Sequence, residues 1–164
     1  MRPVVNRLVL AALLLMLPLS AQAANLHWTA VGSTGTVDPS SNGYTYTGAG
    51  ITYSFSGTFS IQARYNVVNP TGTETPAWTT LEMGYTDPAS GGGSVLAQLI
   101  QVDPCTGATS TICTVSSVNA TQSCRSCTFS ASTINFSTKL YFVQVILNRS
   151  NTNQFPTLYT LRIF

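Results

Sequence analysis

The sequence predicts an all-β protein, an antiparallel β-sandwich of about ten short strands, and three observations support this. Almost every apolar run after residue 23 has strand length and is rich in β-branched and aromatic residues. Gly, Pro, Asn, Asp and Ser residues bound these runs, and no run shows a helical period. The pattern is typical of jelly-roll or Ig-like sandwiches, with a closed barrel as the second alternative.

The first 23 residues have the layout of a secretory signal peptide. Arg2 and Arg7 precede an apolar run from Leu8 to Leu19, and Ala21-Gln22-Ala23 supplies the small residues of a cleavage site. This run is shorter than the roughly 18–20 apolar residues that a membrane-spanning helix needs. We therefore expect cleavage after residue 23, a single domain over residues 24–164, and no transmembrane segment in the mature chain.

Turn residues separate the expected strands along the mature chain, and strand ends are predicted to within about two to four residues. The expected strands are Leu26–Val31, Gly43–Thr47, Ile51–Phe55, Thr58–Val68, Ala77–Tyr85, Val95–Val102, Ile112–Val118, Thr133–Phe136, Lys139–Asn148 and Thr157–Phe164. The first three are short and aromatic, and a Gly-rich segment precedes the sixth. Asp-Pro pairs follow the fifth and sixth, which is turn chemistry.

Alternation within the two longest expected strands predicts which faces are buried. In Thr58–Val68 the apolar face carries Ile61, Ala63, Tyr65 and Val67, and the polar face carries Ser60, Gln62, Arg64 and Asn66. In Lys139–Asn148 one face carries Tyr141, Val143, Val145 and Leu147, and the other carries Phe142, Gln144 and Ile146. We therefore expect the first strand to be wet on one side, and the second to be central and covered on both sides.

Charge is scarce and balanced in residues 24–164. The acids are Asp38, Glu74, Glu82, Asp87 and Asp103, and the bases are Arg64, Arg125, Lys139, Arg149 and Arg162. Polarity comes instead from Ser and Thr, which supply 41 of these 141 residues. A neutral, hydroxyl-rich surface gives little attraction for nucleic acid or anionic membranes, so nucleic-acid binding is excluded, whereas self-association stays open.

Four cysteines lie in one stretch of the chain, namely Cys105, Cys113, Cys124 and Cys127. In an exported protein the even number predicts two disulfides, and sequence alone allows three pairings. We favour Cys105 with Cys113, across a predicted turn, which leaves Cys124 with Cys127. A redox Cys-x-x-Cys site is disfavoured because no amphipathic helix follows it, and a zinc site is disfavoured by the spacing.

No catalytic residue, cofactor or metal ligand is predicted. His27 is the only histidine, and the sequence has no nucleophile motif to accompany it. Of the five carboxylates, Asp38, Asp87 and Asp103 precede proline as turn residues, and only Glu82 lies in an expected strand, which makes no acid–base pair. A structural calcium ion held by one of the three turn aspartates and loop carbonyls stays open.

Aromatic residues are the remaining candidates for a binding site. Trp28, Tyr44, Tyr46 and Trp78 lie in the first half of the chain, and sugar rings stack on such side chains beside hydroxyls and amides. For Trp78 core packing is favoured, since sandwiches usually bury a tryptophan between their sheets. Tyr44 and Tyr46 lie between Gly43 and Gly48, and we expect them to be exposed.

These observations favour an exported, non-enzymatic binding domain, secreted, periplasmic or extracellular, with a neutral polysaccharide as the ligand that fits best. The alternative is a structural or adhesive surface subunit that acts by self-assembly. Low charge and abundant Ser and Thr suit both.

Overall fold

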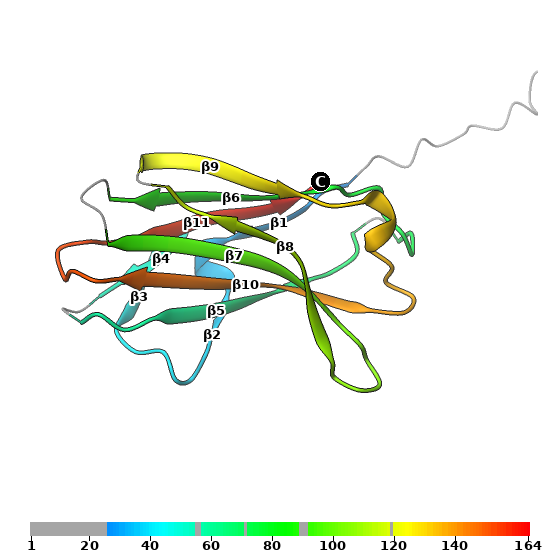
Figure 1. Cartoon of the computed structure of the whole chain (residues 1–164), viewed down its shortest axis with the longest axis horizontal. Helices are drawn as coiled ribbons and strands as arrows, with labels where there is room; N and C mark the ends of the chain where they lie inside the picture. The colour runs from blue at the N-terminus through cyan, green and yellow to red at the C-terminus, as the bar shows by residue number, and fades with distance from the viewer. Residues whose placement is uncertain (1–25, 55–56, 71, 89–91, 119) are drawn as a thin grey trace, which may run out of the picture.

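The computed structural model describes residues 26–54, 57–70, 72–88, 92–118 and 120–164, which form two stacked antiparallel sheets (Figure 1). The predicted all-β sandwich is confirmed. The predicted signal peptide, residues 1–23, lies outside the described residues. In the described part of the chain no helix has the length and hydrophobicity that crossing a membrane requires.

The first sheet contains six strands in the order β3-β4-β11-β6-β9, with β1 also paired to β11. They are β1 (Trp28–Val31), β3 (Tyr44–Thr47), β4 (Gly50–Tyr53), β6 (Thr80–Asp87), β9 (Ala120–Thr128) and β11 (Thr157–Ile163). Because β6 pairs along one edge of β11, β1 and β4 share the other edge. The short 3-10 helix η2 (Gly32–Thr34) follows β1 at this junction.

The second sheet contains five strands in the order β2-β5-β10-β7-β8. They are β2 (Thr36–Val37), β5 (Ile61–Val67), β7 (Gly93–Val102), β8 (Thr109–Ser116) and β10 (Leu140–Arg149). The predicted central position of the strand at Lys139–Asn148 is confirmed by β10. Its predicted coverage on both sides is wrong, because Phe142, Gln144 and Ile146 are only half-buried. Only the inner face of this sheet packs against another sheet.

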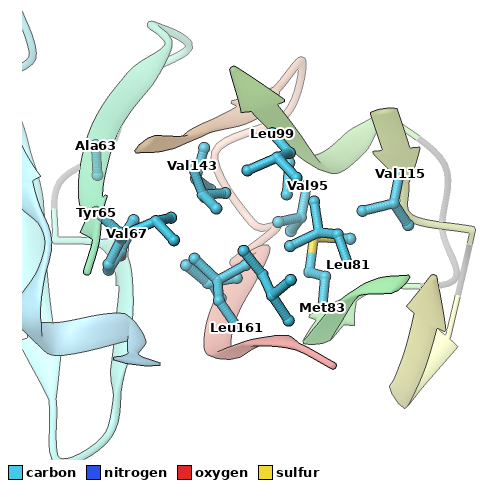
Figure 2. Packing of buried hydrophobic residues seen from close by; sticks show 14 of the residues in the cluster. Ala63, Tyr65, Val67, Leu81, Met83, Val95, Leu99, Val115, Val143 and Leu161 are labelled. Carbon is cyan, nitrogen blue, oxygen red and sulfur yellow. The ribbon is translucent and has the colours of Figure 1, made fainter. Parts of the chain in front are cut away.

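The core lies between the inner faces of the two sheets. Alternate residues of β5 and β10 are buried there, as their alternation predicts. Figure 2 shows Val95, Leu99 and Val143 of the second sheet facing Leu81, Met83 and Leu161 of the first. Burying one such side chain contributes roughly 1.5–3 kcal/mol, so this shared interior is the main source of stability.

Three elements differ from the prediction. Thr133–Phe136 is not a strand: a 3-10 helix, η3 (Ala131–Thr133), precedes a loop from which Ile134 inserts fully into the core. Strands β2 and β9 were not expected, since β2 has two residues and β9 is rich in Ser and Thr. β9 is an edge strand, and its polar composition suits a strand with one unpaired side.

The cysteine pairing also differs from the favoured one. Cys113 of β8 is joined to Cys127 of β9 with a Cα–Cα distance of 6.0 Å, while Cys105 and Cys124 are free and exposed. Cys124 and Cys127 both lie in β9, three residues apart, so their side chains point to opposite faces and cannot meet. Cys105 lies in the β7–β8 turn, beyond the end of the strand that carries Cys113.

Candidate functional site

A cleft of about 800 Å³ lies along the side of the sandwich where β1 of the first sheet faces β2 and β5 of the second. Its buried lining residues are Trp28, Tyr65 and Leu161, which are 5, 3 and 1 % exposed. Exposed uncharged polar residues also line it, namely Thr29, Thr34, Thr36, Asn66 and Thr160. Neighbours in one strand face opposite sides, so the buried residues point into the core and the exposed ones point towards solvent at the rim of the cleft. An apolar base therefore lies beside hydroxyl and amide groups.

Tyr65 connects the two sheets beside the cleft. It comes from β5, and its hydroxyl donates a hydrogen bond to the carbonyl oxygen of Gly32 at 2.6 Å. Burial raises the pKa of this phenol well above its usual range, so the hydroxyl stays protonated as a donor. The chain passes close over the ring at Gly35, where an added Cβ would lie 2.4 Å from Cζ of Tyr65. Only glycine fits that close approach.

Both arginines of the cleft have acidic partners. Arg162 donates to Glu82 at 2.8 Å, and Arg64 donates to Asp38 at 3.4 Å. The hydroxyl and backbone N–H of Ser40 lower the pKa of Asp38, with a smaller contribution from Arg64. The cleft therefore offers paired charges, which can share hydrogen bonds with a polar ligand without requiring a charged one.

The predicted exposure of Tyr44 and Tyr46 is confirmed. Both lie on the edge strand β3 and are 36 and 44 % exposed. Their rings meet edge to face, with centroids 5.6 Å apart, and the Tyr46 hydroxyl donates to Gly35 O at 3.1 Å. Partial burial, followed by the neighbouring Tyr44, raises the pKa of Tyr46. Edge-to-face rings do not make one flat platform, and a ligand role for this pair stays a prediction.

The two tryptophans lie in different surroundings. Trp28 is at the base of the cleft, where little of its ring is accessible. Trp78 is fully buried, donates its indole N–H to Leu26 O at 3.0 Å and packs edge to face on Phe136. A ring with no exposed face cannot stack on a sugar, so its place in the candidate site is corrected to core packing, the reading that the sequence favours.

The cleft continues into a row of polar residues that the sequence analysis did not identify. Neighbouring strands of the second sheet place Thr36, Arg64, Gln144, Gln98 and Thr114 opposite one another, in that order. Amide nitrogens of Gln144 and Gln98 donate to Gln62 and Thr114 at 3.0 and 3.3 Å. At about 4.8 Å per strand the row is about 19 Å long. Only the register between strands reveals it.

The described residues hold few groups for acid–base or metal chemistry. His27 is exposed and its ring lies 5.5 Å from that of Phe164. Glu82 is the one acidic residue among those that line the cleft, and it is paired with Arg162. Within the described ranges no group of three His, Cys, Asp or Glu side chains could hold a metal ion.

Known proteins resemble this chain in fold. No family model and no curated protein matches its sequence. The CBM36-1 domain of a multidomain xylanase from the hindgut metagenome of Trinervitermes trinervoides aligns with 85 % of this chain and 97 % of its own length, at 10 % identity and a TM-score of 0.50. The xylan-binding module CBM15 aligns with 85 % of this chain and 95 % of its own, at 17 % identity and a TM-score of 0.51. The chain shares their sandwich fold.

Proposed function

We propose that this protein is an exported, non-catalytic domain that binds a neutral polysaccharide in the cleft between β1 and β5. The observation that carries the proposal is the lining of that cleft, an apolar base beside threonine hydroxyls, the Asn66 amide and paired charges. Sugars present apolar ring faces and many hydroxyls without net charge, so they complement such a lining. The row of polar residues from Thr36 to Thr114, called the glutamine row below, adds the amides of Gln144 and Gln98 as contacts for a polysaccharide of several sugar units.

The fold and the chemistry of the site support the proposal in different ways. Two domains of the same fold are described as part of a xylanase and as a xylan-binding module, which makes xylan the first polysaccharide to test. A non-catalytic role is supported by the composition of the cleft: among its described lining residues Glu82 is the one carboxylate, whereas acid–base hydrolysis of a glycosidic bond uses two. Export is supported by the signal-like residues 1–23 and by the disulfide, which persists in oxidising compartments.

The direct test is retention of the mature, oxidised protein on insoluble xylan and a panel of other neutral polysaccharides. Asn66→Ala and Thr160→Ala each remove one polar group from the cleft, while Thr121→Ala is a matched change on exposed β9. A hydrogen bond with a net value of about 1 kcal/mol corresponds to a roughly fivefold loss of affinity. We expect this loss for the cleft variants and none for Thr121→Ala.

Two other results would redirect the assignment. Loss of binding in Tyr44→Ala or Tyr46→Ala, with both cleft variants unchanged, would move the site to the exposed tyrosine pair. Absence of retention on every polysaccharide, together with a large oligomer on size-exclusion chromatography, would favour the alternative of a subunit that self-assembles.

A further inference from the structure

The glutamine row lies on the outer face of the second sheet, next to apolar side chains of the same face. Residues two apart in a strand share a face, so Phe142 and Ile146 of β10 lie on either side of Gln144, with Cα atoms about 7 Å from its own. In the neighbouring strand β7 (Figure 1), Ile100 lies beside Gln98 in the same way. Amide groups and apolar surface are therefore adjacent on this face.

Phe142 supplies an aromatic ring beside the amides. It lies in β10 opposite Asn66 of β5 and Ile100 of β7. Ile100 is only 7 % exposed although it belongs to the outer face, whereas Phe142 is half-buried, so part of its side chain stays accessible. A partly buried aromatic ring offers a rigid, flat apolar surface, which is what the apolar face of a sugar stacks on.

The two glutamines are held in place and still have hydrogen-bonding capacity. The amide nitrogens of Gln144 and Gln98 donate to Gln62 Oε1 and Thr114 Oγ1 at 3.0 and 3.3 Å. Within the described residues neither of their own Oε1 atoms accepts a hydrogen bond, and each amide nitrogen has a second N–H. A sugar hydroxyl both donates and accepts, so it can use both kinds of group. Because the amides are already oriented, binding immobilises less side-chain freedom.

The glutamine row begins at the cleft and runs to the far edge of the sheet. Thr36 and Arg64 are its first two members and also line the cleft, as does Asn66, the strand partner of Phe142. Neighbouring strands lie about 4.8 Å apart, so a ligand that leaves the cleft and crosses the sheet meets one member of the row in each strand. The row ends at Thr114 on β8, and both β2 and β8 are edge strands.

We infer that the polysaccharide crosses the strands of the second sheet from the cleft to β8, with a sugar ring stacked on Phe142 and sugar hydroxyls bound to Gln144 and Gln98. This inference rests on the proposed function and specifies its ligand as an internal stretch of a linear, uncharged polysaccharide. Because both ends of the row lie on edge strands, the polysaccharide can continue past the protein in both directions. The one charged member of the row, Arg64, is paired with Asp38, so no charge on the ligand is required.

The experiment is isothermal titration of the mature, oxidised protein with oligosaccharides of increasing length. Xylobiose, xylotetraose and xylohexaose are used for xylan, or the corresponding series if another polysaccharide of the panel retains the protein. The cleft alone can hold the shortest ligand, whereas the longest also reaches Phe142 and the two glutamines. Added hydrogen bonds with Gln144 and Gln98 should therefore raise the affinity roughly tenfold or more from xylobiose to xylohexaose.

Variants separate the row from the cleft. Gln98→Ala should weaken xylohexaose binding roughly fivefold and leave xylobiose binding unchanged, because Gln98 lies two strands away from the residues that line the cleft. Phe142→Leu keeps an apolar side chain and removes the flat ring, so it should cause a loss of similar size with an unchanged thermal unfolding midpoint. Gln122→Ala and Phe155→Leu are matched changes at exposed positions outside the row and should bind as the wild type does.

The inference and the proposed function fail in different ways. Equal affinity of the wild type for the short and long oligosaccharides, with Gln98→Ala and Phe142→Leu unchanged, would overturn the path across the sheet and leave binding in the cleft intact. A wild-type protein that binds no polysaccharide of the panel and no oligosaccharide would overturn both.

Discussion

The two long sides of the sandwich, where an edge of one sheet meets an edge of the other, are closed in different ways. On one side the Cys113–Cys127 disulfide joins β8 to β9 covalently. On the other side β1 and β5 leave a cleft, and the chain crosses between the sheets through η2 and β2. The comparison shows that one covalent link holds the edges that offer little apolar surface, while the opposite side stays open to a ligand.

On the open side, hydrogen bonds from tyrosines hold the crossing segment in place, whereas on the closed side the disulfide joins the two edges covalently. Tyr65 of the second sheet donates to Gly32 O, and Tyr46 of the first sheet donates to Gly35 O. Each bond has a net value of about 1 kcal/mol, less than a disulfide contributes. The open side is therefore the one that small sequence changes should reshape.

Among the changes that test this comparison, removing the disulfide should lower the free energy of unfolding most. The bridge closes a loop with a sequence separation of 14, for which chain entropy predicts a stabilisation of about 3 kcal/mol. We expect the Cys113→Ala/Cys127→Ala double variant to lose about that free energy of unfolding in urea titrations. Cys105→Ala changes an exposed free thiol and should leave stability unchanged.

The pairing itself has a separate check. Alkylation of the oxidised, unfolded protein followed by mass spectrometry should label Cys105 and Cys124 and no other cysteine. Four labelled cysteines, or none, would contradict the disulfide arrangement on which the closed side depends.

A methyl group at Gly35 should disturb the open side next most strongly. Because an added Cβ would lie 2.4 Å from Cζ of Tyr65, Gly35→Ala forces the ring or the η2–β2 segment to move. Such overpacking costs typically about 1–3 kcal/mol, which urea unfolding measures. A double-mutant cycle with Tyr65→Leu isolates the clash, since the shorter side chain leaves room for the methyl group. Additive effects in that cycle would rule out the contact as the cause.

Alternation along single strands could be read from the sequence, and that was enough for the sandwich class. The apolar faces of β5 and β10 follow directly from Ile61–Val67 and Tyr141–Leu147. Elements whose composition is polar were missed: β9 became visible only as the partner of β6. The correct disulfide could not be predicted without β9, because Cys127 lies in that strand.

The candidate site depends on register between strands distant in sequence, which composition does not encode. Tyr44 and Tyr46 were identified because turn residues flank them, and their exposure could be predicted locally. The cleft and the glutamine row combine residues of strands separated by most of the chain, such as Thr29 opposite Arg162. No local signal places those groups together.

The smallest expected effect is on the pH dependence of stability. It compares two turn aspartates, Asp103 on the closed side and Asp38 on the open side. Asp103, in the β7–β8 turn, accepts from Lys139 Nζ at 2.7 Å and from the N–H groups of Cys105 and Thr106, and these bonds, led by Lys139, hold its pKa well below the ordinary 3.8. A lowered folded-state pKa gives stability that is present above pH 3.8 and is lost as pH falls towards the folded value.

Asp103→Asn should therefore unfold with less dependence on pH than the wild type below about pH 4, in urea titrations at a series of pH values. Asp38→Asn is the matched variant on the open side, where Ser40 is the main cause of the lowered pKa and Arg64 contributes less. Both carboxyl groups are solvent-accessible, so water and salt screen the charge interactions and each effect should be small. If Asp103→Asn shows the same acid dependence as the wild type, the Lys139–Asp103 bond does not strengthen the turn, and the disulfide alone distinguishes the closed side.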